Sequence, residues 1–411
     1  MQFVNSKAFA QGLDETDPLR SFRSQFFFPK VRPDAEYLYL CGNSLGLQPR
    51  STRTMINEEL DDWAKYGVEG HVEAKRPWIA YHENLTKMMA KIVGAKPHEV
   101  VCMNSLTVNL HLMMVSFYRP EGKRRQILIE AGAFPSDQYA VASQVRFHGF
   151  DPNTDILELA PREGEDTLRT EDILSYINEH GEKVALIMLG GVNYLSGQAY
   201  DMVAITKKGH EKGCTVGFDL AHAAGNITLE LHDWNVDFAV WCTYKYLNSG
   251  PGGVAAAFVH ERNLDKDLPR FEGWWGHNKE RRFKMEAEFD PIPFSVEAWQ
   301  LSTPPIFLLA SLRASLKLFD QAGMKSIRAK SKTLTSYLEF LVEDTFGSRD
   351  WIITPRAPSE RGAQLSFRIP KDGHGVLEAL RNRGVICDFR EPNIIRAAPA
   401  PLYNSYPPVP A

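Results

Sequence analysis

The sequence has few cysteines, and their arrangement indicates neither a disulfide framework nor a metal site. There are five in 411 residues, an odd number, and none belongs to a C-x-x-C pair. Each lies beside apolar residues, so we expect them to be reduced side chains of the core. They are Cys41, Cys102, Cys214, Cys242 and Cys387.

Long hydrophobic runs are also missing. The longest apolar stretches, such as residues 184–189, are far too short to span a bilayer. The amino terminus carries acidic residues where a signal or transit peptide would not. The sequence therefore predicts a protein of the cytosol without membrane partners.

No excess of positive charge is present. With 47 Lys and Arg against 51 Asp and Glu, the formal net charge is −4, which gives no electrostatic reason to expect nucleic-acid binding. The short basic run at 123–125 is typical of a solvated turn. A chain of 411 residues with 44% hydrophobic and 24% charged residues indicates a globular protein of two or more units that acts on small molecules.

The most informative stretch is 213–253, GCTVGFDLAHAAGNITLELHDWNVDFAVWCTYKYLNSGPGG. Residues 214–218 and 238–243 are apolar and favour two buried strands. Asp219 follows the first strand directly, and Tyr244 and Lys245 follow the second. Because ligands bind at the carboxyl edge of open α/β sheets, neighbouring strands would bring Asp219 and Lys245 to one site.

An acid and a lysine facing one cavity fit pyridoxal phosphate. Lysine forms a Schiff base with the aldehyde of this cofactor, and a carboxylate keeps its ring nitrogen protonated. His222, the small residues around it, the hydroxyl of Tyr244 and the glycines of 250–253 would leave room for a flat, phosphorylated ring. On this segment alone, an Asp that caps a turn and a surface Lys remain an equal alternative.

Further site candidates lie at other expected strand ends. Residues 106–117 predict an apolar helix, and its first turn, with Leu106 and Thr107, would offer unpaired N–H groups to a phosphate. After the expected strand 127–130, Phe134 could stack on a planar ring and Asp137 could support the charge of Asp219. For the first segment a helix start without a ligand is the commoner role, and the second segment could also be a simple helix start.

Two isolated residues are candidates for substrate contact. His71 lies in an expected polar loop, 67–76, where a histidine is usually just solvated. Arg396 follows an apolar strand candidate and could present a fork to a carboxylate, although an ordinary salt bridge is the commoner role.

The order of elements predicts an α/β fold with a mainly parallel central sheet wrapped by helices, followed by a smaller α+β domain. We expect an N-terminal arm at 1–50 that packs onto the large domain of 51–304, and a small domain at 305–411. The segment 271–303 is rich in Trp and Pro and suits a lid or an interface. The other expected helices are 52–66, 77–93, 201–212, 306–321 and 324–344, and the other expected strands are 100–103 and 184–189, with short ones around Trp351, Leu365, Val385 and Ile394.

Nine motifs, in order, closely resemble the kynureninase family between about residues 39 and 405. They are YLCGNSLGLQP, SLTVN, FPSDQY, GFDLAHAAGN, LHDW, TYKYLNSGPGG, GWWGH, STPPI and IIRAAPAPLYNS. The resemblance implies a pyridoxal-phosphate enzyme of the aspartate-aminotransferase fold, fold type I, and so many ordered motifs make it highly specific.

The resemblance also implies residue roles. Lys245 would be the Schiff-base lysine and Asp219 the partner of the ring nitrogen, with Asp137 behind it, Phe134 stacked on the ring and His222 beside the cofactor. Arg396 would hold the α-carboxylate of the substrate. Leu106, Thr107, Tyr244, Trp274 and Thr303 would surround the phosphate, and Ser44, His71 and Arg396 would face the substrate.

The implied reaction is hydrolysis of L-kynurenine or 3-hydroxy-L-kynurenine to L-alanine and anthranilate or 3-hydroxyanthranilate, in tryptophan degradation and nicotinamide-cofactor synthesis. Tyr244, with the phosphate, is a candidate for activating the water. The resemblance further implies a homodimer in which Trp274 and Thr303 reach the partner's site. Family members usually continue into a terminal helix, whereas this sequence ends in YPPVPA.

Other functions remain as alternatives. Cysteine desulfurases and class V aminotransferases share the Asp and Lys, but they usually carry Gln at the place of His222 and His at the place of Tyr244. A metal-dependent hydrolase could use Asp219, His222, His232 and Asp233 as ligands. A regulatory module that only binds the cofactor would need a DNA-binding surface that the sequence lacks.

Overall fold

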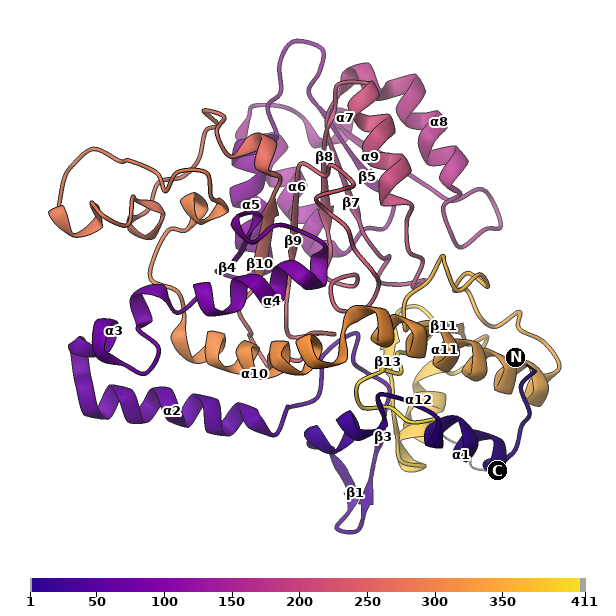
Figure 1. Ribbon diagram of the computed structural model, residues 1–411. Coiled ribbons are helices and arrows are strands. Elements are labelled where there is room, and N and C mark those ends of the chain that lie inside the picture. Colours follow the sequence, from indigo (N-terminus) through magenta and orange to yellow (C-terminus); the bar gives the residue numbers. More distant parts are fainter. Residues whose placement is uncertain (1, 407–411) are drawn as a thin grey trace.

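A seven-stranded sheet lies at the centre of the structure, a computed structural model that describes residues 2–406 (Figure 1). Strand β10 is antiparallel to both of its neighbours, and the remaining pairs are parallel. The expected mainly parallel sheet is therefore confirmed. In spatial order the strands are β4 (Val100–Cys102), β10 (Ala256–Val259), β9 (Phe238–Trp241), β8 (Thr215–Asp219), β7 (Val184–Gly190), β5 (Gln126–Glu130) and β6 (Ile156–Leu159).

Helices cover both faces of the sheet, because alternate residues of each strand point to opposite sides. In β9, for example, Trp241 belongs to one buried apolar cluster and Val240 to the other. The cluster on the face of Trp241 includes side chains of α4 (Glu83–Val93), α8 (Thr170–His180), α9 (Met202–Glu211) and α10 (Ile306–Ala322). The opposite cluster includes side chains of α5 (Leu106–Phe117) and α6 (Pro135–Phe147).

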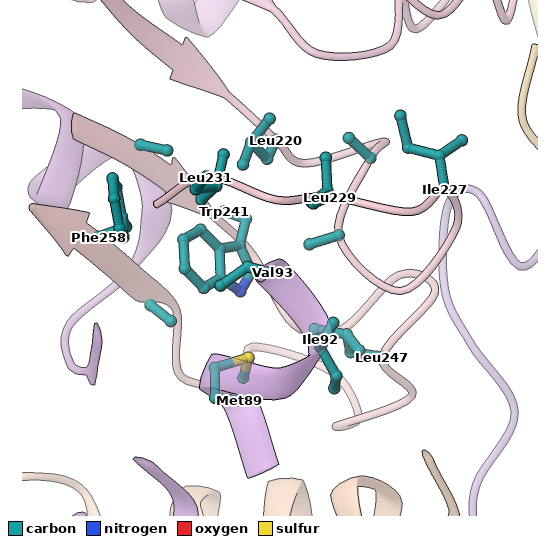
Figure 2. Close-up of a cluster of buried hydrophobic side chains, with 14 of the residues drawn as sticks. Met89, Ile92, Val93, Leu220, Ile227, Leu229, Leu231, Trp241, Leu247 and Phe258 are labelled. Atoms are coloured by element: carbon teal, nitrogen blue, oxygen red, sulfur yellow. The ribbon is translucent and has the colours of Figure 1, made fainter. Parts of the chain in front are cut away.

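A cluster of buried hydrophobic side chains lies beneath the segment after β8 (Figure 2). Trp241 is fully buried there and lies beside Val93 near the end of α4. Fully burying such large side chains contributes several kcal/mol each, so the backbone that leaves β8 and β9 is firmly held. The surrounding side chains in this view are Met89, Ile92, Leu220, Ile227, Leu229, Leu231, Leu247 and Phe258.

A second, antiparallel sheet lies in the C-terminal part of the chain, in the order β11 (Leu365–Arg368), β14 (Ile394–Ala397), β13 (Asp388–Arg390). Helices α11 (Met324–Phe346) and α12 (Gly373–Asn382) belong to the same part. The proline-rich end of the sequence, residues 407–411, lies outside the described residues.

The N-terminal arm contributes to the buried cluster on the central sheet, and it also packs on the C-terminal part. Its helix α1 (Lys7–Glu15) packs on α11, because buried Ala10 fits against Leu334 and Tyr337. Its strand β3 (Leu38–Tyr39) pairs in parallel with β12 (Val385–Ile386). The arm also has a two-stranded ribbon, β1 (Lys30–Arg32) and β2 (Ala35–Glu36). The arm thus joins the C-terminal part to the rest of the chain.

Three local expectations were wrong. Helix α4 begins at Glu83 and not at residue 77, because Trp78 and Tyr81 both donate hydrogen bonds to buried Glu59 of α2 (Ser51–Tyr66), at 3.3 and 3.0 Å, and hold a separate short turn. Residues 67–76 are not simply a loop, since they include the short helix α3 (Gly70–Glu73). No strand contains Trp351; only a single bridge joins its neighbour Ile352 to β11.

None of the helices within residues 2–406 combines the length and the apolar composition needed to cross a membrane.

Asp237, just before β9, links strand β8 to side chains of α9 and of the segment after β10. Its carboxylate accepts hydrogen bonds from the Val216 amide at 2.9 Å, His210 at 2.8 Å and Arg262 at 2.6 Å. Burial alone would raise the pKa of Asp237, but these contacts lower it from 3.8 to about 2. A depressed acid pKa stabilises the fold above the unfolded-state pKa, and this stabilisation is lost as the pH falls through the folded-state value.

We therefore expect Asp237→Asn to lower the free energy of unfolding by about 2 kcal/mol at neutral pH. The gap to the wild type should close as the pH falls from about 4 to about 2, because the wild-type carboxylate then takes up its proton. Thermal unfolding at pH 7 and pH 3 measures this, with exposed Asp233→Asn as the control. An equal loss at both pH values would show that the contribution of Asp237 does not depend on its charge.

Candidate active site

A cavity of about 170 Å³ opens at the carboxyl edge of the central sheet. It contains both Asp219, the last residue of β8, and Lys245, four residues after β9. The expected meeting of these two side chains at one edge is what the structure shows. The lining residues are Leu106, Thr107, Glu130, Phe134, Ser136, Asp137, Gly190, Val192, Tyr194, Asp219, Ala221, His222, Tyr244 and Lys245.

The turn that carries Lys245 is fixed from two sides. The Thr243 and Ser249 hydroxyls lie 2.6 Å apart across its base, which closes the turn. The amide of Gly46 donates to the Tyr244 carbonyl at 2.8 Å. A side chain at position 46 would collide with the Lys245 carbonyl and with Asn248, so the glycine of the NSLG motif is required by this close approach.

Lys245 contacts the imidazole of His222. The two side-chain nitrogens, Nζ and Nε2, are 2.9 Å apart. Burial, together with the positive charge of Lys245, holds the pKa of His222 well below its usual range. A neutral imidazole has one acceptor nitrogen, so Nε2 accepts from the lysine and the proton lies on Nδ1. This Nδ1 is buried and has no hydrogen-bond partner in the structure.

Three carboxyl groups, those of Glu130, Asp137 and Asp219, lie together in the wall of the cavity. Burial raises the pKa of Asp137 well above its usual range, and the charge of nearby Asp219 adds to the shift. Burial also raises the pKa of Glu130, to about 7. Asp219 accepts a hydrogen bond from the Ala221 amide at 2.7 Å, which opposes the effect of its burial. We infer that Asp219 carries the negative charge and that Asp137 holds a proton.

The other end of the cavity can receive an anion. Leu106 and Thr107 form the first turn of α5, whose N-cap, Ser105, makes no side-chain capping bond. The first amides of a helix have no intrahelical partners, and the helix dipole favours a negative group there. The Thr107 hydroxyl lies 2.9 Å from the Ser136 hydroxyl, so two hydroxyls face the same place.

These features fit pyridoxal phosphate. The cavity offers a lysine amine and, nearby, a buried carboxylate for a ring nitrogen. Its helix start suits a phosphate, and the partly exposed ring of Phe134 lies with its centroid 5.8 Å from Nζ of Lys245. The unpartnered Nδ1 of His222 and Oδ1 of Asp137 are buried polar atoms that a bound ligand would satisfy.

The expected substrate residues Ser44 and Arg396 lie together next to this cavity. Arg396 donates from Nη2 to Ser44 Oγ at 3.1 Å and from Nη1 to the carbonyl of Tyr194 at 2.6 Å. Tyr194 itself lines the cavity. Arg396 is therefore one residue removed from the cavity wall.

Three other expected site residues lie elsewhere in the subunit. His71 is in α3, where its ring meets Trp78 and its Nδ1 lies 3.0 Å from the Val68 carbonyl. Trp274 is 46% exposed and donates to the Arg282 carbonyl at 3.1 Å. Thr303 is also exposed. None of the three lines the described cavity of its own chain, and their roles stay predictions.

Among the lining residues with polar side chains, three were not singled out from the sequence, namely Glu130, Ser136 and Tyr194. Glu130 ends β5 as Asp219 ends β8, so the rule that singled out Asp219 would also have found it. Tyr194 lies in the loop after β7, where only the general importance of strand-end loops is a signal.

The metal-ligand alternative finds no support in residues 2–406. None of the groups of three potential ligands there contains Asp219, His222 or Asp233. His232 does belong to one, with Glu99 and His260. However, both ring nitrogens of His260 are already used, one toward the Arg262 amide at 3.1 Å and one toward the His232 carbonyl at 3.1 Å.

Comparison with known proteins identifies close relatives. A family model described as kynureninase C-terminal domain matches residues 327–410. Kynureninase of Myxococcus xanthus is 62% identical over 98% of this chain and 95% of the relative. Kynureninase of Koribacter versatilis is 55% identical with the same coverage of both chains.

Solved structures share the fold at low identity. A cysteine desulfurase from Thermococcus onnurineus superposes with a TM-score of 0.74 at 17% identity, over 98% of this chain and 96% of the other. A K223A mutant of the protein C-DES, with glycine covalently linked to its pyridoxal-phosphate cofactor, gives 0.77 at 18% identity, over 93% and 96%. These structures confirm fold type I, and the relatives decide between its members. At 55–62% identity over nearly its whole length, the chain belongs to the kynureninase family, pyridoxal-phosphate-dependent hydrolases that act on carbon–carbon bonds in ketonic substances.

Proposed function

We propose that this protein hydrolyses the Cβ–Cγ bond of L-kynurenine or 3-hydroxy-L-kynurenine, releasing L-alanine and anthranilate or 3-hydroxyanthranilate. The observation that carries the proposal is the single cavity that holds Lys245, Asp219 and His222 in a chain with kynureninase relatives. We also propose a cytosolic enzyme that serves tryptophan degradation and nicotinamide-cofactor synthesis, which the family resemblance supports.

When bound, pyridoxal phosphate supplies an aldehyde for the substrate amine and a protonated ring that draws electrons away from the breaking bond. Lys245 would hold the cofactor through its amine, and its Nζ would take the proton from the α-carbon of the substrate. His222, neutral and 2.9 Å from Nζ, accepts a hydrogen bond from this amine and so orients it.

The acids would keep the ring nitrogen of the cofactor protonated. Asp219 would direct its negative charge toward that nitrogen, and Asp137, whose pKa burial raises, would support Asp219. A second charged carboxylate beside Asp219 would be repelled by it, so one proton between the two acids is the stable arrangement. Phe134 would cover the ring, and the first turn of α5, with Leu106 and Thr107, would hold the phosphate.

Arg396 would bind the α-carboxylate of the substrate, with Ser44 and His71 as further substrate contacts. Burial raises the pKa of Tyr244 above its usual range, so its hydroxyl keeps its proton and can donate toward the phosphate or toward the attacking water. Tyr244 is our candidate for positioning this water.

Incubation of the purified protein with pyridoxal phosphate and L-kynurenine tests the proposal. We expect equal amounts of anthranilate and L-alanine, detected by fluorescence and by amino-acid analysis. The ratio of kcat/KM for the two kynurenines then assigns the preferred substrate. A metal chelator should change neither value, because no metal ligand takes part.

Release of sulfide from L-cysteine, without aryl amine from either kynurenine, would contradict the proposal. It would favour the desulfurase activity of the structural relatives.

For assembly, we propose a homodimer with active sites at the interface. Part of the segment 271–303 loops outward at the left of Figure 1, and the segment exposes Trp274, Phe283 and Phe294, although residues 296–299 pack on the sheet. Helix α2 exposes Trp63, which contacts Phe307. Exposed aromatic groups of this size are typical of protein interfaces. We also propose that the large and small domains meet near residue 304, where α10 begins.

A mixing experiment tests the shared site. Lys245→Ala and the double variant Trp274→Ala, Thr303→Ala should each be inactive alone. After joint unfolding and refolding, about a quarter of wild-type activity should return. Half of the dimers would be mixed, and each mixed dimer would have one of its two sites intact. Each variant refolded alone is the control.

Mixed dimers that form but stay inactive would place Trp274 and Thr303 in the site of their own subunit. Differently tagged chains, purified by both tags in turn, establish that the mixed dimers formed.

A further inference from the structure

The guanidinium of Arg396 is buried and already occupied. Arg396 is 1% exposed, and its Nε donates to Asp388 Oδ1 at 2.7 Å while Nη2 donates to Asp388 Oδ2. Nη2 also reaches Ser44 and Nη1 reaches the Tyr194 carbonyl. These contacts use four of the five N–H groups of an arginine. A second carboxylate therefore finds no free pair of donors on Arg396 while Asp388 remains in place.

Asp388 is placed there by the sheet. Strands β13 and β14 are antiparallel, and Asp388 lies directly opposite Arg396 in their register. The Ser44 hydroxyl donates to the same carboxylate, which brings the NSLG motif into the cluster. A buried arginine without a counter-charge is strongly unfavourable, so Asp388 stabilises Arg396 in the absence of substrate.

A second arginine, Arg390, lies beside this pair. Arg390 is two residues after Asp388 on β13, so both side chains lie on the same face of the strand. Its Nη2 is 3.4 Å from Asp388 Oδ2, and its Nε is buried without a hydrogen-bond partner in the structure. Arg390 could therefore donate hydrogen bonds to the Asp388 carboxylate if that carboxylate moved away from Arg396.

We propose that Asp388 is a positioning residue that occupies the fork of Arg396 in the free enzyme, yields it to the α-carboxylate of the substrate and turns to Arg390. This inference rests on the proposed function, in which Arg396 is the carboxylate anchor. Two arginines and one aspartate carry a net charge of +1 before binding, and the substrate carboxylate neutralises it. The exchange makes the carboxylate of the ligand a requirement, because a ligand without one cannot replace Asp388.

The test is binding of L-alanine, a product that carries the carboxylate, compared with L-alaninamide, which lacks it. Both are followed by the absorbance of the bound cofactor, without turnover. Asp388→Asn removes the competing charge, so L-alanine should bind about tenfold more tightly, while L-alaninamide should be unaffected. The melting temperature should fall, because Arg396 loses its counter-charge. For L-kynurenine, KM should fall and kcat should stay within twofold.

Three further variants complete the design. Glu391→Gln removes one negative charge directly after β13, where Glu391 pairs with the exposed His374, and should change nothing. Asp388→Glu should restore the wild-type affinity for L-alanine. Arg390→Gln removes the alternative partner, so Asp388 should stay on Arg396 and L-alanine should bind several-fold more weakly. This last variant keeps the test valid if Asp388→Asn does not fold.

Weaker binding of L-alanine by Asp388→Asn would overturn the exchange, because Asp388 would then act as a clamp that aligns Arg396 for the substrate. Unchanged binding in both Asp388→Asn and Arg390→Gln would overturn it as well. Arg396→Gln tests the role of Arg396 as the carboxylate anchor separately from the exchange of Asp388. It should lose L-alanine binding by at least tenfold and keep the cofactor, and normal L-alanine binding by this variant would instead refute Arg396 as the anchor.

Discussion

Replacing Lys245 with alanine is expected to abolish turnover and to remove the covalent, borohydride-reducible link to the cofactor. Lys245 is the lysine that lines the cavity, and its Nζ lies between His222 and the ring of Phe134. Without this amine the protein loses both the attachment point and the base that takes the α-proton. We expect kcat to fall by roughly 10⁴-fold or more.

The measurement combines steady-state kinetics with borohydride reduction and peptide mapping. Lys208→Ala is the matched control, since Lys208 is at the surface and pairs with Glu211. It should keep both the activity and the label at position 245. The fold should persist in Lys245→Ala, because Nζ has His222 as its hydrogen-bond partner and no buried ion pair is lost. A label found on Lys207 or Lys208 in the wild type would refute the assignment.

The sequence predicted five of the seven strands of the central sheet, β4, β5, β7, β8 and β9, because they are short apolar runs. Strands β6 and β10 were not predicted. The edge that joins Asp219 and Lys245 followed from this pattern alone. Helix α5 was predicted with its observed bounds, Leu106–Phe117. The start of α4 was missed, since contacts of Trp78 and Tyr81 with Glu59 decide it, and those residues are distant in sequence.

Site residues could be predicted from the sequence where their position at the end of a strand was enough to single them out. Contacts between side chains from distant segments could not be predicted in this way. Arg396 was singled out as a fork for a carboxylate, but its partner Asp388 was not, because the pairing of β13 with β14 brings them together. In the same way, the sequence around His71 or Trp274 does not indicate whether the side chain belongs to the active site of its own subunit or to that of a partner.

Replacing Asp219 with asparagine should have the second largest effect. Asparagine keeps the size of the side chain and can still accept the hydrogen bond from the Ala221 amide. It cannot carry the negative charge that keeps the ring nitrogen of the cofactor protonated. An unprotonated ring draws electrons poorly, so we expect kcat to fall by about 10²- to 10⁴-fold and the cofactor to bind more weakly.

The loss of this charge should also change the pKa values of the neighbouring acids. A purely structural role of Asp219 would not predict this change. The charge of Asp219 contributes to the raised pKa values of Asp137 and Glu130, after burial. In Asp219→Asn both acids should therefore ionise more easily, and proton uptake by the protein should shift to lower pH. Asp233→Asn, an exposed acid of the same connection, should show neither effect.

Near-normal turnover in Asp219→Asn would mean that Asp137 or Glu130 is the true partner of the ring nitrogen. The double variant Asp219→Asn, Asp137→Asn then decides between them. If Asp137 had taken over the charge, the second substitution would cause the loss that the first did not. If activity survived both, Glu130 would be the remaining carboxylate in the cavity wall able to hold the proton at that nitrogen.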